Sequence, residues 1–226
     1  MSSEGTEKKQ INFRYIAVEG AIKSGKTKLA NRLSQKIGGR VVYDKQENPY
    51  LKDFYNEKEG AAFLAQLVFL VNRYHQQVAL LQRTLFEERT ICDYLFEKDK
   101  IYAYQTLTDD ELLVYDKIFN IFFERIAKPD LVIYLQLSLP TLLKRIAREG
   151  TDLEKNISEK YLEDMLEAFD YFFFNFQSVP LLVVKADHVD FADEESLDDL
   201  IDNIKQMDKS PLYYVPLNRS NRDTGK

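Results

Sequence analysis

Cysteine, histidine and tryptophan are scarce in this sequence of 226 residues. It contains one cysteine (Cys92), two histidines (His75 and His188) and no tryptophan. A disulfide framework is therefore excluded, and a structural zinc site or a catalytic Cys–His pair is poorly supplied. The low cysteine content is typical of a protein from a reducing compartment.

The sequence also lacks an excess of basic charge and a long apolar run. Its 31 Lys and Arg residues stand against 37 Asp and Glu, which gives a net charge of −6. We expect no nucleic-acid polymer as a partner, because binding such a polyanion needs clustered basic charge. Residues such as Gln66, Arg73 and Arg145 interrupt the apolar stretches, so none reaches the roughly 20 residues of a membrane span. Residues 1–10 contain no apolar core of a secretory signal, and we expect a cytoplasmic protein with no membrane partner.

Short apolar runs alternate along the chain with longer segments whose apolar residues recur every three or four positions. The short runs predict strands at residues 15–18, 40–43, 90–92, 131–135 and 181–184. The longer segments predict helices at residues 26–37, 61–83, 109–126, 139–148, 158–176 and 195–207. This alternation favours an α/β fold with three layers, α/β/α, around a five-stranded parallel sheet. The composition predicts one domain over residues 11–208, with flexible ends at residues 1–10 and 209–226.

The most specific motif directly follows the first predicted strand. It matches the pattern G-x-x-x-x-G-K-[ST] with Gly20, Ala21, Ile22, Lys23, Ser24, Gly25, Lys26 and Thr27. A chance match in a Gly/Ser loop is the alternative, but a strand before the loop and a helix after it are the context that phosphate binding needs. We expect the loop N–H groups and Lys26 to bind the phosphates of a nucleoside triphosphate, and Thr27 to offer its hydroxyl to Mg²⁺.

The phosphate loop alone does not separate a GTPase from an ATPase or a small-molecule kinase. A GTPase would carry Asn-Lys-x-Asp after a late strand, whereas this chain has Val184-Lys185-Ala186-Asp187. Guanine selection is therefore not expected. A kinase needs a second pocket, in which a carboxylate lies beside the acceptor hydroxyl.

Candidate residues for such a pocket follow the predicted strands and interrupt the long helix. Glu47 comes after the second strand, and the carboxyl ends of parallel strands face the ligand crevice. Gln66 and Arg73 interrupt the apolar stripe of the helix at residues 61–83, where a buried amide could pair with a nucleobase edge or with the backbone. Asp93 follows the third strand, where it could hold Mg²⁺ or cap the next helical turn.

Taken together, these segments resemble the deoxynucleoside kinase family, which phosphorylates the 5′-hydroxyl of deoxyribonucleosides. The likeness covers roughly residues 15–207 and rests on YIAVEGAIKSGKT, ENPYLKDFY, FLAQLVFLVNRYHQQ, CDYLFEKDKIYA, PDLVIYLQLSLPTLLKRIAREG and PLLVVKADHVDF, in this order. The resemblance implies a P-loop kinase fold, ATP as the phosphate donor, Mg²⁺ as a cofactor, a purine deoxynucleoside as the favoured substrate and a helix-packed homodimer.

The resemblance also implies roles for residues on the acceptor side. Glu47 falls where the family has its general base for the 5′-hydroxyl. Gln66 falls where an amide of the family reads the base, and Arg73, on the same helix, is a further candidate for substrate binding. Tyr55 and Glu154 fall near positions that hold the 3′-hydroxyl of the sugar.

On the donor side, the resemblance implies cationic and base-flanking residues. Arg145 and Arg148 lie where the family's lid brings cations to the transferring phosphoryl group. Asp187 lies in the segment of residues 185–191 that would flank the adenine of ATP.

Two positions depart from the family's pattern. Many members have Asp-Arg-Ser or Glu-Arg-Ser after the third strand, where the arginine contacts the reaction centre, but this chain has Asp93-Tyr94-Leu95. Relatives often have Arg-Gly-Arg in the lid, where this chain has Glu149-Gly150-Thr151. Loss of one transition-state cation can cost several orders of magnitude in rate. A catalytically weak relative, or one that only binds nucleotides as a regulator, is therefore the alternative to an active kinase.

Overall fold

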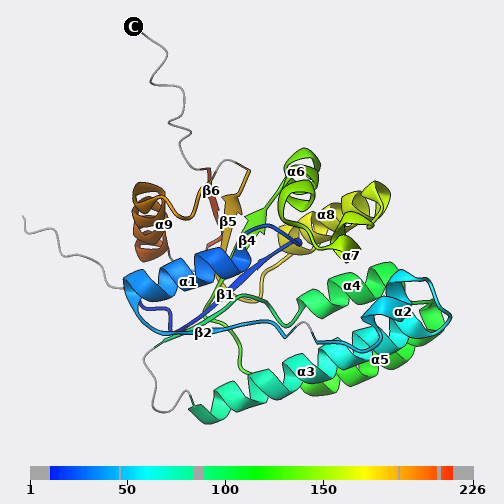
Figure 1. The fold of residues 1–226 in the computed structure, drawn as a ribbon. Helices are drawn as coiled ribbons and strands as arrows, with labels where there is room; N and C mark the ends of the chain where they lie inside the picture. Colours follow the sequence, from blue (N-terminus) through cyan, green and yellow to red (C-terminus); the bar gives the residue numbers. More distant parts are fainter. Residues whose placement is uncertain (1–10, 46, 84–88, 188, 208–209, 216–226) are drawn as a thin grey trace, which may run out of the picture.

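The computed structural model describes residues 11–45, 47–83, 89–187, 189–207 and 210–215. Within these ranges the strands are β1 (Tyr15–Gly20), β2 (Arg40–Val42), β3 (Thr90–Cys92), β4 (Leu131–Gln136), β5 (Leu181–Lys185) and β6 (Leu212–Tyr214). The helices are α1 (Lys26–Ile37), α2 (Leu51–Tyr55), α3 (Ala61–Arg83), α4 (Lys98–Thr106), α5 (Asp109–Phe123), α6 (Leu139–Glu149), α7 (Asp152–Lys155), α8 (Glu159–Phe174) and α9 (Glu194–Gln206). Figure 1 shows their arrangement around the sheet.

The strands form one parallel sheet in the order β2-β3-β1-β4-β5-β6. The chain runs from β1 to one side of the sheet and returns to the other side with β4, so β1 lies at the point where the strand order reverses. In such sheets, ligands bind outside the carboxyl ends of the strands at this point. The sheet therefore places the residues that follow β1, β2 and β3 around one crevice.

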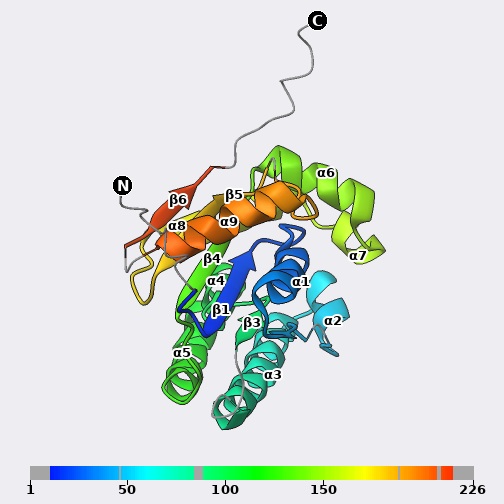
Figure 2. The ribbon, with the colours of Figure 1, turned by 90° about the vertical axis from the view of Figure 1, so that its left-hand side faces the viewer.

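Helices lie on both faces of the sheet (Figure 1, Figure 2), and the side chains of β1 pack alternately into the cores on these two faces. Ile16 and Val18 pack in the core that includes α1 and α9. Tyr15 and Ala17 pack in the core that includes α8 and part of α4. A third apolar cluster joins α3, α4 and α5. Both faces of the sheet are covered, which agrees with the nearly continuous apolar sequence of its central strands.

The predicted three-layer α/β/α fold with a parallel sheet is confirmed, but the sheet has a sixth strand instead of ending at five. This strand, β6, lies in the segment that composition predicts to be a flexible tail. The strand is only three residues long, too short for the sequence to predict it, and it pairs with β5 in parallel. Tyr214 packs in the core and donates a hydrogen bond from its hydroxyl to Asp199 Oδ2 at 2.5 Å. The predicted flexible residues 1–10 and 216–226 lie outside the described residues.

Three helices were not predicted from the sequence. Helices α2 and α7 span five and four residues, too few for an apolar period to show. Helix α4 is longer, but its buried side begins with Lys98 and Asp99, two charged residues that hide its helical pattern. Every helix in the described ranges is too short or too polar to cross a bilayer.

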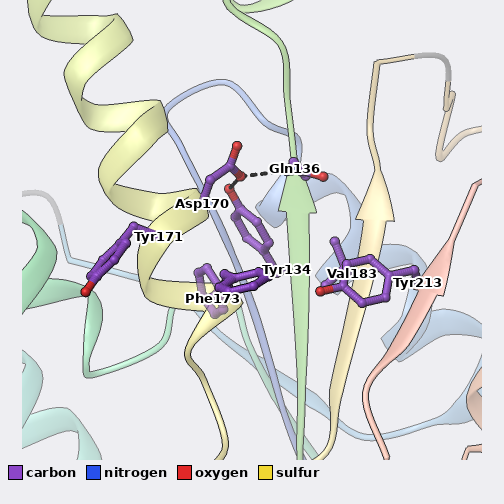
Figure 3. A pocket seen from close by; sticks show the side chains of 8 residues that line it. Tyr134, Gln136, Asp170, Tyr171, Phe173, Val183 and Tyr213 are labelled. Carbon is purple, nitrogen blue, oxygen red and sulfur yellow. Dashed lines mark hydrogen bonds between the residues drawn. The ribbon is translucent and has the colours of Figure 1, made fainter.

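Aromatic side chains at the carboxyl end of α8 lie on opposite sides of this helix (Figure 3). The Phe173 ring stacks on Tyr134 of β4 with centroids 4.1 Å apart, and the Tyr134 hydroxyl donates to Asp170 Oδ1 at 2.7 Å. Phe174, the next residue, is 79% exposed. A cavity of about 330 Å³ lies beside this stack and reaches Tyr213 of β6. It shares no lining residue with the larger cavity described below.

This difference in burial predicts that two neighbouring substitutions change the free energy of unfolding by very different amounts. We expect Phe173→Ala to lower the free energy of unfolding by about 3–5 kcal/mol, because it removes a buried ring and leaves a cavity. Phe174→Ala is the matched control and should change it by less than about 0.5 kcal/mol. Urea unfolding of the two variants measures both values, and equal destabilisation would contradict the packing described here.

Candidate functional site

A cavity of about 810 Å³ lies at the carboxyl ends of the strands. This volume is within the range of small-molecule sites. Its walls come from the phosphate loop between β1 and α1, from the segments after β2 and β3, from α3, from α6 and α7, and from the segment after β5. The cavity therefore joins elements that are far apart in the sequence.

The phosphate loop has the close backbone packing that its glycines permit. A Cβ atom at Gly20 would lie 2.7 Å from both Leu135 O and Ser24 Oγ. Gly25 has φ = 104° and precedes α1, and a Cβ atom there would lie 3.3 Å from the Phe191 ring. The first N–H groups of α1 consequently face the cavity without a capping side chain, an arrangement that binds phosphate. The Ser24 hydroxyl is buried with no hydrogen-bond partner among the described residues.

Lys26 lies across its own loop. Its Nζ donates to Gly20 O at 2.7 Å and to Ala21 O at 2.9 Å, and lies 3.9 Å from Glu19 Oε1. Burial lowers the pKa of Lys26 to about 8, against the opposing effect of the Glu19 carboxylate. Lys26 is therefore held at the cavity with a charge that an incoming anion would stabilise.

The structure brings the two predicted Mg²⁺ ligands together. Thr27 Oγ1 donates to Asp93 Oδ2 at 2.5 Å, and both residues line the cavity. Oxygen donors of this kind suit Mg²⁺, which takes its remaining ligands from phosphate and water. Among the described residues no cluster of three Asp, Glu, His or Cys side chains could hold a metal ion by itself. The alternative role of Asp93 as a helix cap is wrong, because the next helix, α4, has Glu97 at its N-cap.

The carboxylate that the segment after β2 brings into the cavity is Asp44, and the expected position of Glu47 is wrong. Glu47 is exposed and is not among the residues that line the cavity, and its backbone carbonyl accepts from Asn72 Nδ2 at 3.3 Å. Asp44 lines the cavity with a side chain only 4% exposed. The reason is distance along the chain, since Asp44 is two residues beyond the strand end and Glu47 is five.

Two cations surround the Asp44 carboxylate. Arg73 donates from Nε to Oδ1 at 2.8 Å and from Nη2 to Oδ2 at 2.9 Å, and Lys98 Nζ lies 2.5 Å from Oδ2. Burial by itself would raise the pKa of Asp44, but Lys98 and Arg73 outweigh it and hold the pKa well below its usual value. The Asp44 backbone N–H donates to Asp93 Oδ1 at 2.6 Å. Asp44 thus connects α3, α4 and the predicted Mg²⁺ ligands.

Gln66 and Arg73 both lie in the cavity wall, on the same side of α3. Gln66 Nε2 donates to Thr106 Oγ1 at 3.3 Å, and the Arg73 guanidinium lies 4.9 Å above the Phe69 ring. Arg73 also donates to Asp99, whose Oδ2 is buried with no hydrogen-bond partner in the described part of the chain. Burial raises the pKa of Asp99 to about 6, although Arg73 opposes the shift. The pairing of Arg73 with Asp99 could not be predicted from the sequence, because Asp99 lies in α4, a helix that was not predicted.

The residues predicted for the sugar lie together at the cavity wall. Tyr55 and Glu154 both line it, and Glu154 Oε2 lies 3.0 Å from Nζ of Lys23 in the phosphate loop. Burial and the nearby Glu154 carboxylate raise the pKa of Tyr55. The N–H of Thr151 donates to Glu154 Oε2 at 2.6 Å, so the lid segment fixes this carboxylate through a capping box.

The two predicted lid arginines lie in different environments. Arg145 donates from Nη1 to Lys23 O and Ser24 O at 3.0 and 2.9 Å, and from Nη2 to Ala186 O at 2.7 Å. It therefore ties the phosphate loop to the end of β5. Arg148 has a side chain 68% exposed and pairs with Glu149 at the cavity rim.

Asp187 lies at the end of the cavity next to the phosphate loop. Its Oδ1 accepts from the backbone N–H of Ser138 at 3.0 Å, which links the segment after β5 to the start of α6. Phe191, from the same segment, lines the cavity where it packs against Gly25. Asp187 and Phe191 thus form the end of the cavity where the segment after β5 meets the phosphate loop.

Comparisons with known proteins agree with this geometry. The family model described as deoxynucleoside kinase matches residues 16–208. The chain is 36% identical to a deoxyguanosine kinase of Bacillus subtilis (strain 168), over 78% of this chain and 88% of that protein. It is 28% identical to a deoxyadenosine kinase of Dictyostelium discoideum, over 86% of this chain and 80% of that protein. A solved structure of deoxyadenosine kinase from M. mycoides with bound dATP has a TM-score of 0.70 and 27% identity, covering 84% of this chain and 97% of that one.

The position of Lys26 predicts a pH dependence of phosphate binding. We expect the affinity for a nucleoside triphosphate to fall up to about tenfold between about pH 7 and about pH 9, because Lys26 loses its charge as pH rises through its pKa of about 8. Calorimetric titration of the triphosphate at a series of pH values measures this change. In Lys26→Met the affinity should be lower throughout and nearly flat over this interval. A fall of equal size in both proteins would show that another group titrates.

Proposed function

The chain belongs to the deoxynucleoside kinase family, and from this premise we propose that it transfers the γ-phosphoryl group of ATP to the 5′-hydroxyl of a purine deoxynucleoside. The observation that carries this proposal is the single cavity in which the phosphate loop faces the polar pocket of Gln66 and Arg73. Phosphoryl transfer needs both substrates positioned in one site and charge to neutralise the moving group. This cavity can hold both substrates, and its Lys and Arg side chains supply the positive charge.

On the donor side, the loop N–H groups and the Lys26 ammonium bind the phosphates. Thr27 and Asp93 hold Mg²⁺, which neutralises phosphate charge when it is bound. Arg145 keeps the loop in position through its carbonyl oxygens, and Arg148 can approach the phosphates from the rim. The support for ATP as the donor is Val184, which stands where a guanine-selecting protein would have asparagine.

On the acceptor side, Asp44 takes the role that the sequence suggested for Glu47. Its carboxylate orients the 5′-hydroxyl by accepting its hydrogen bond. Because the pKa of Asp44 is low, it takes the proton only as the new bond to phosphorus forms and the hydroxyl becomes acidic. Support comes from the burial of its side chain in the cavity and from the hydrogen bond of its backbone N–H to Asp93, one of the predicted Mg²⁺ ligands. Tyr55 and Glu154 hold the 3′-hydroxyl from the opposite wall.

The polar groups of the pocket beyond Asp44 support a nucleobase as its ligand, and we infer a preference for purines from the similar proteins. The Gln66 amide offers both a donor and an acceptor, and Arg73 lies in the same wall, fixed from behind by the buried Asp99 carboxylate. A base edge that carries both donors and acceptors would satisfy these groups, whereas a purely apolar ligand would leave them unpaired. The names of the similar proteins, deoxyguanosine kinase and deoxyadenosine kinase, support the same preference.

The outer surface of α3 and α5 supports a homodimer. Exposed apolar side chains gather on these two neighbouring helices, namely Leu64 and Val71 on α3 and Leu113, Val114 and Ile121 on α5. Apolar residues exposed over one surface favour burial against a second protein surface.

A substrate panel tests the proposed reaction. With ATP and Mg²⁺, we expect a 5′-monophosphate from deoxyguanosine or deoxyadenosine, at a kcat/KM more than about tenfold above that for thymidine, as the names of the similar deoxyguanosine and deoxyadenosine kinases suggest. Chromatography of the products measures this. No monophosphate from any deoxynucleoside would contradict the proposal. Saturable nucleotide binding without product would instead identify the regulatory alternative.

Two carboxylate variants test which residue is the base. Asp44→Asn should lower kcat by about 10²–10⁴-fold, because an amide cannot accept the proton, while Glu47→Gln should stay near the wild-type rate. Because Asp44→Asn leaves two buried cations without their counter-charge, Asp44→Glu serves as a second variant that keeps the carboxylate. Unfolding temperature and ATP affinity are measured for each variant. The opposite order of activities would restore Glu47 as the base.

A further inference from the structure

Lys98 is a buried cation in the cavity wall. It is the first residue of α4, it is 5% exposed, and its Nζ lies 2.5 Å from Asp44 Oδ2. Burying an ammonium group is costly unless a partner compensates it. Asp44 already has a cation in Arg73, which bonds both of its oxygens. Arg73 also donates to the buried Asp99, so Lys98 completes the charge balance of this cluster while its ammonium group lies in the cavity wall.

The residue that stands in the place of the family's arginine does not enter the cavity. Tyr94 follows Asp93 directly, but its side chain is fully buried in the core between the sheet and α8. Its hydroxyl accepts a hydrogen bond from Gln77 Nε2 at 3.0 Å. Lys98 comes four residues later, and its side chain lines the cavity. The cation missing after β3 is thus present at the start of α4.

Arg73 and Lys98 differ in what they can still bind. Arg73 uses Nε and Nη2 on Asp44 and Nη1 on Asp99, so its planar guanidinium is fixed between two carboxylates. Lys98 Nζ carries three donors, and its hydrogen bond within the described residues goes to Asp44. An ammonium group can therefore keep Asp44 and still donate to a second anion. The phosphate loop and Lys26 lie in the wall of the same cavity, so a phosphoryl group is the second anion that fits.

We propose that Lys98 is a catalytic cation that bridges Asp44 Oδ2 and the transferring phosphoryl group. This inference rests on the proposed function. As the 5′-oxygen attacks the γ-phosphorus, the bond between that phosphorus and the leaving ADP oxygen breaks, and its electron pair stays on ADP. The hydroxyl proton goes to Asp44, and Lys98 keeps its own protons while it donates hydrogen bonds to the phosphoryl oxygens. Lys98 thereby supplies the positive charge that the arginine after the third strand supplies in many family members.

The test compares Lys98→Met, Lys98→Arg and the control Lys100→Met. Lys100 lies on the same helix, outside the cavity lining, and pairs with Asp116. We expect Lys98→Met to lower kcat by about 10³-fold, the lower end of what a transition-state cation contributes, with the KM for deoxynucleoside changed by less than about threefold. Lys98→Arg should recover at least about a tenth of the wild-type rate, because it restores a positive charge, and Lys100→Met should match the wild type.

A second measurement separates catalysis from a merely structural role. ADP with aluminium fluoride and a deoxynucleoside imitates the phosphoryl group in transfer, so its affinity reports transition-state contacts. Lys98→Met should bind ADP and the deoxynucleoside like the wild type but lose affinity for the aluminium fluoride complex by a factor similar to its loss of kcat.

Three outcomes would overturn the role of Lys98. They are a Lys98→Met variant with near wild-type kcat, a loss of kcat that Lys98→Arg fails to restore, and unchanged affinity for the aluminium fluoride complex. If the wild-type protein itself forms no monophosphate, the proposed function fails and not merely the role of Lys98. If the wild type and Lys98→Met are equally active, only the inference about Lys98 is refuted.

Discussion

The Asp44 carboxylate, held between Arg73 and Lys98, is the interaction on which the rest of the site depends. A buried carboxylate is stable only when its charge is compensated, and here the compensating groups come from α3 and α4. The Asp44 backbone reaches Asp93, and Asp93 reaches Thr27 at the start of α1. One continuous set of hydrogen bonds therefore runs from the polar pocket to the phosphate loop. It fixes the distance between the two substrates that the cavity has to align.

This arrangement explains how the chain can be a kinase although it lacks an arginine after β3. Electrostatic catalysis depends on where a charge lies, and a different residue can supply that charge from another position. Tyr94 belongs to the core behind the sheet, where it joins Gln77 in a buried hydrogen-bond network. Lys98 points from the start of α4 into the cavity and meets Asp44 there. The position changes, but a cation is still next to the carboxylate of the acceptor pocket.

The fold and the phosphate loop could be predicted from local patterns in the sequence, whereas the carboxylate and the cation beside it could not. The phosphate loop could be predicted because its glycines, its lysine and its flanking strand and helix lie within a few residues of one another. The bounds of α1 and the start of α3 were predicted to the residue, since their apolar residues recur regularly. The strand β3 was predicted because its three residues are apolar or β-branched, and all three are buried. The acceptor side depends on how far a chain turns after a strand ends, and this decides between Asp44 and Glu47. Lys98 and Asp99 were missed because charged residues on the buried side of α4 hide its helical period.

The central claim is that one cavity presents the 5′-hydroxyl of a deoxynucleoside to the Asp44 carboxylate, opposite a triphosphate on the phosphate loop. A crystal structure of the protein with deoxyguanosine and a non-hydrolysable ATP analogue measures this directly. The account predicts that the 5′-oxygen lies about 3 Å from an Asp44 carboxylate oxygen, with the γ-phosphate between Lys26 and Lys98. A deoxynucleoside bound with its 5′-oxygen at Glu47, or bound away from the loop of residues 20–27, would contradict it.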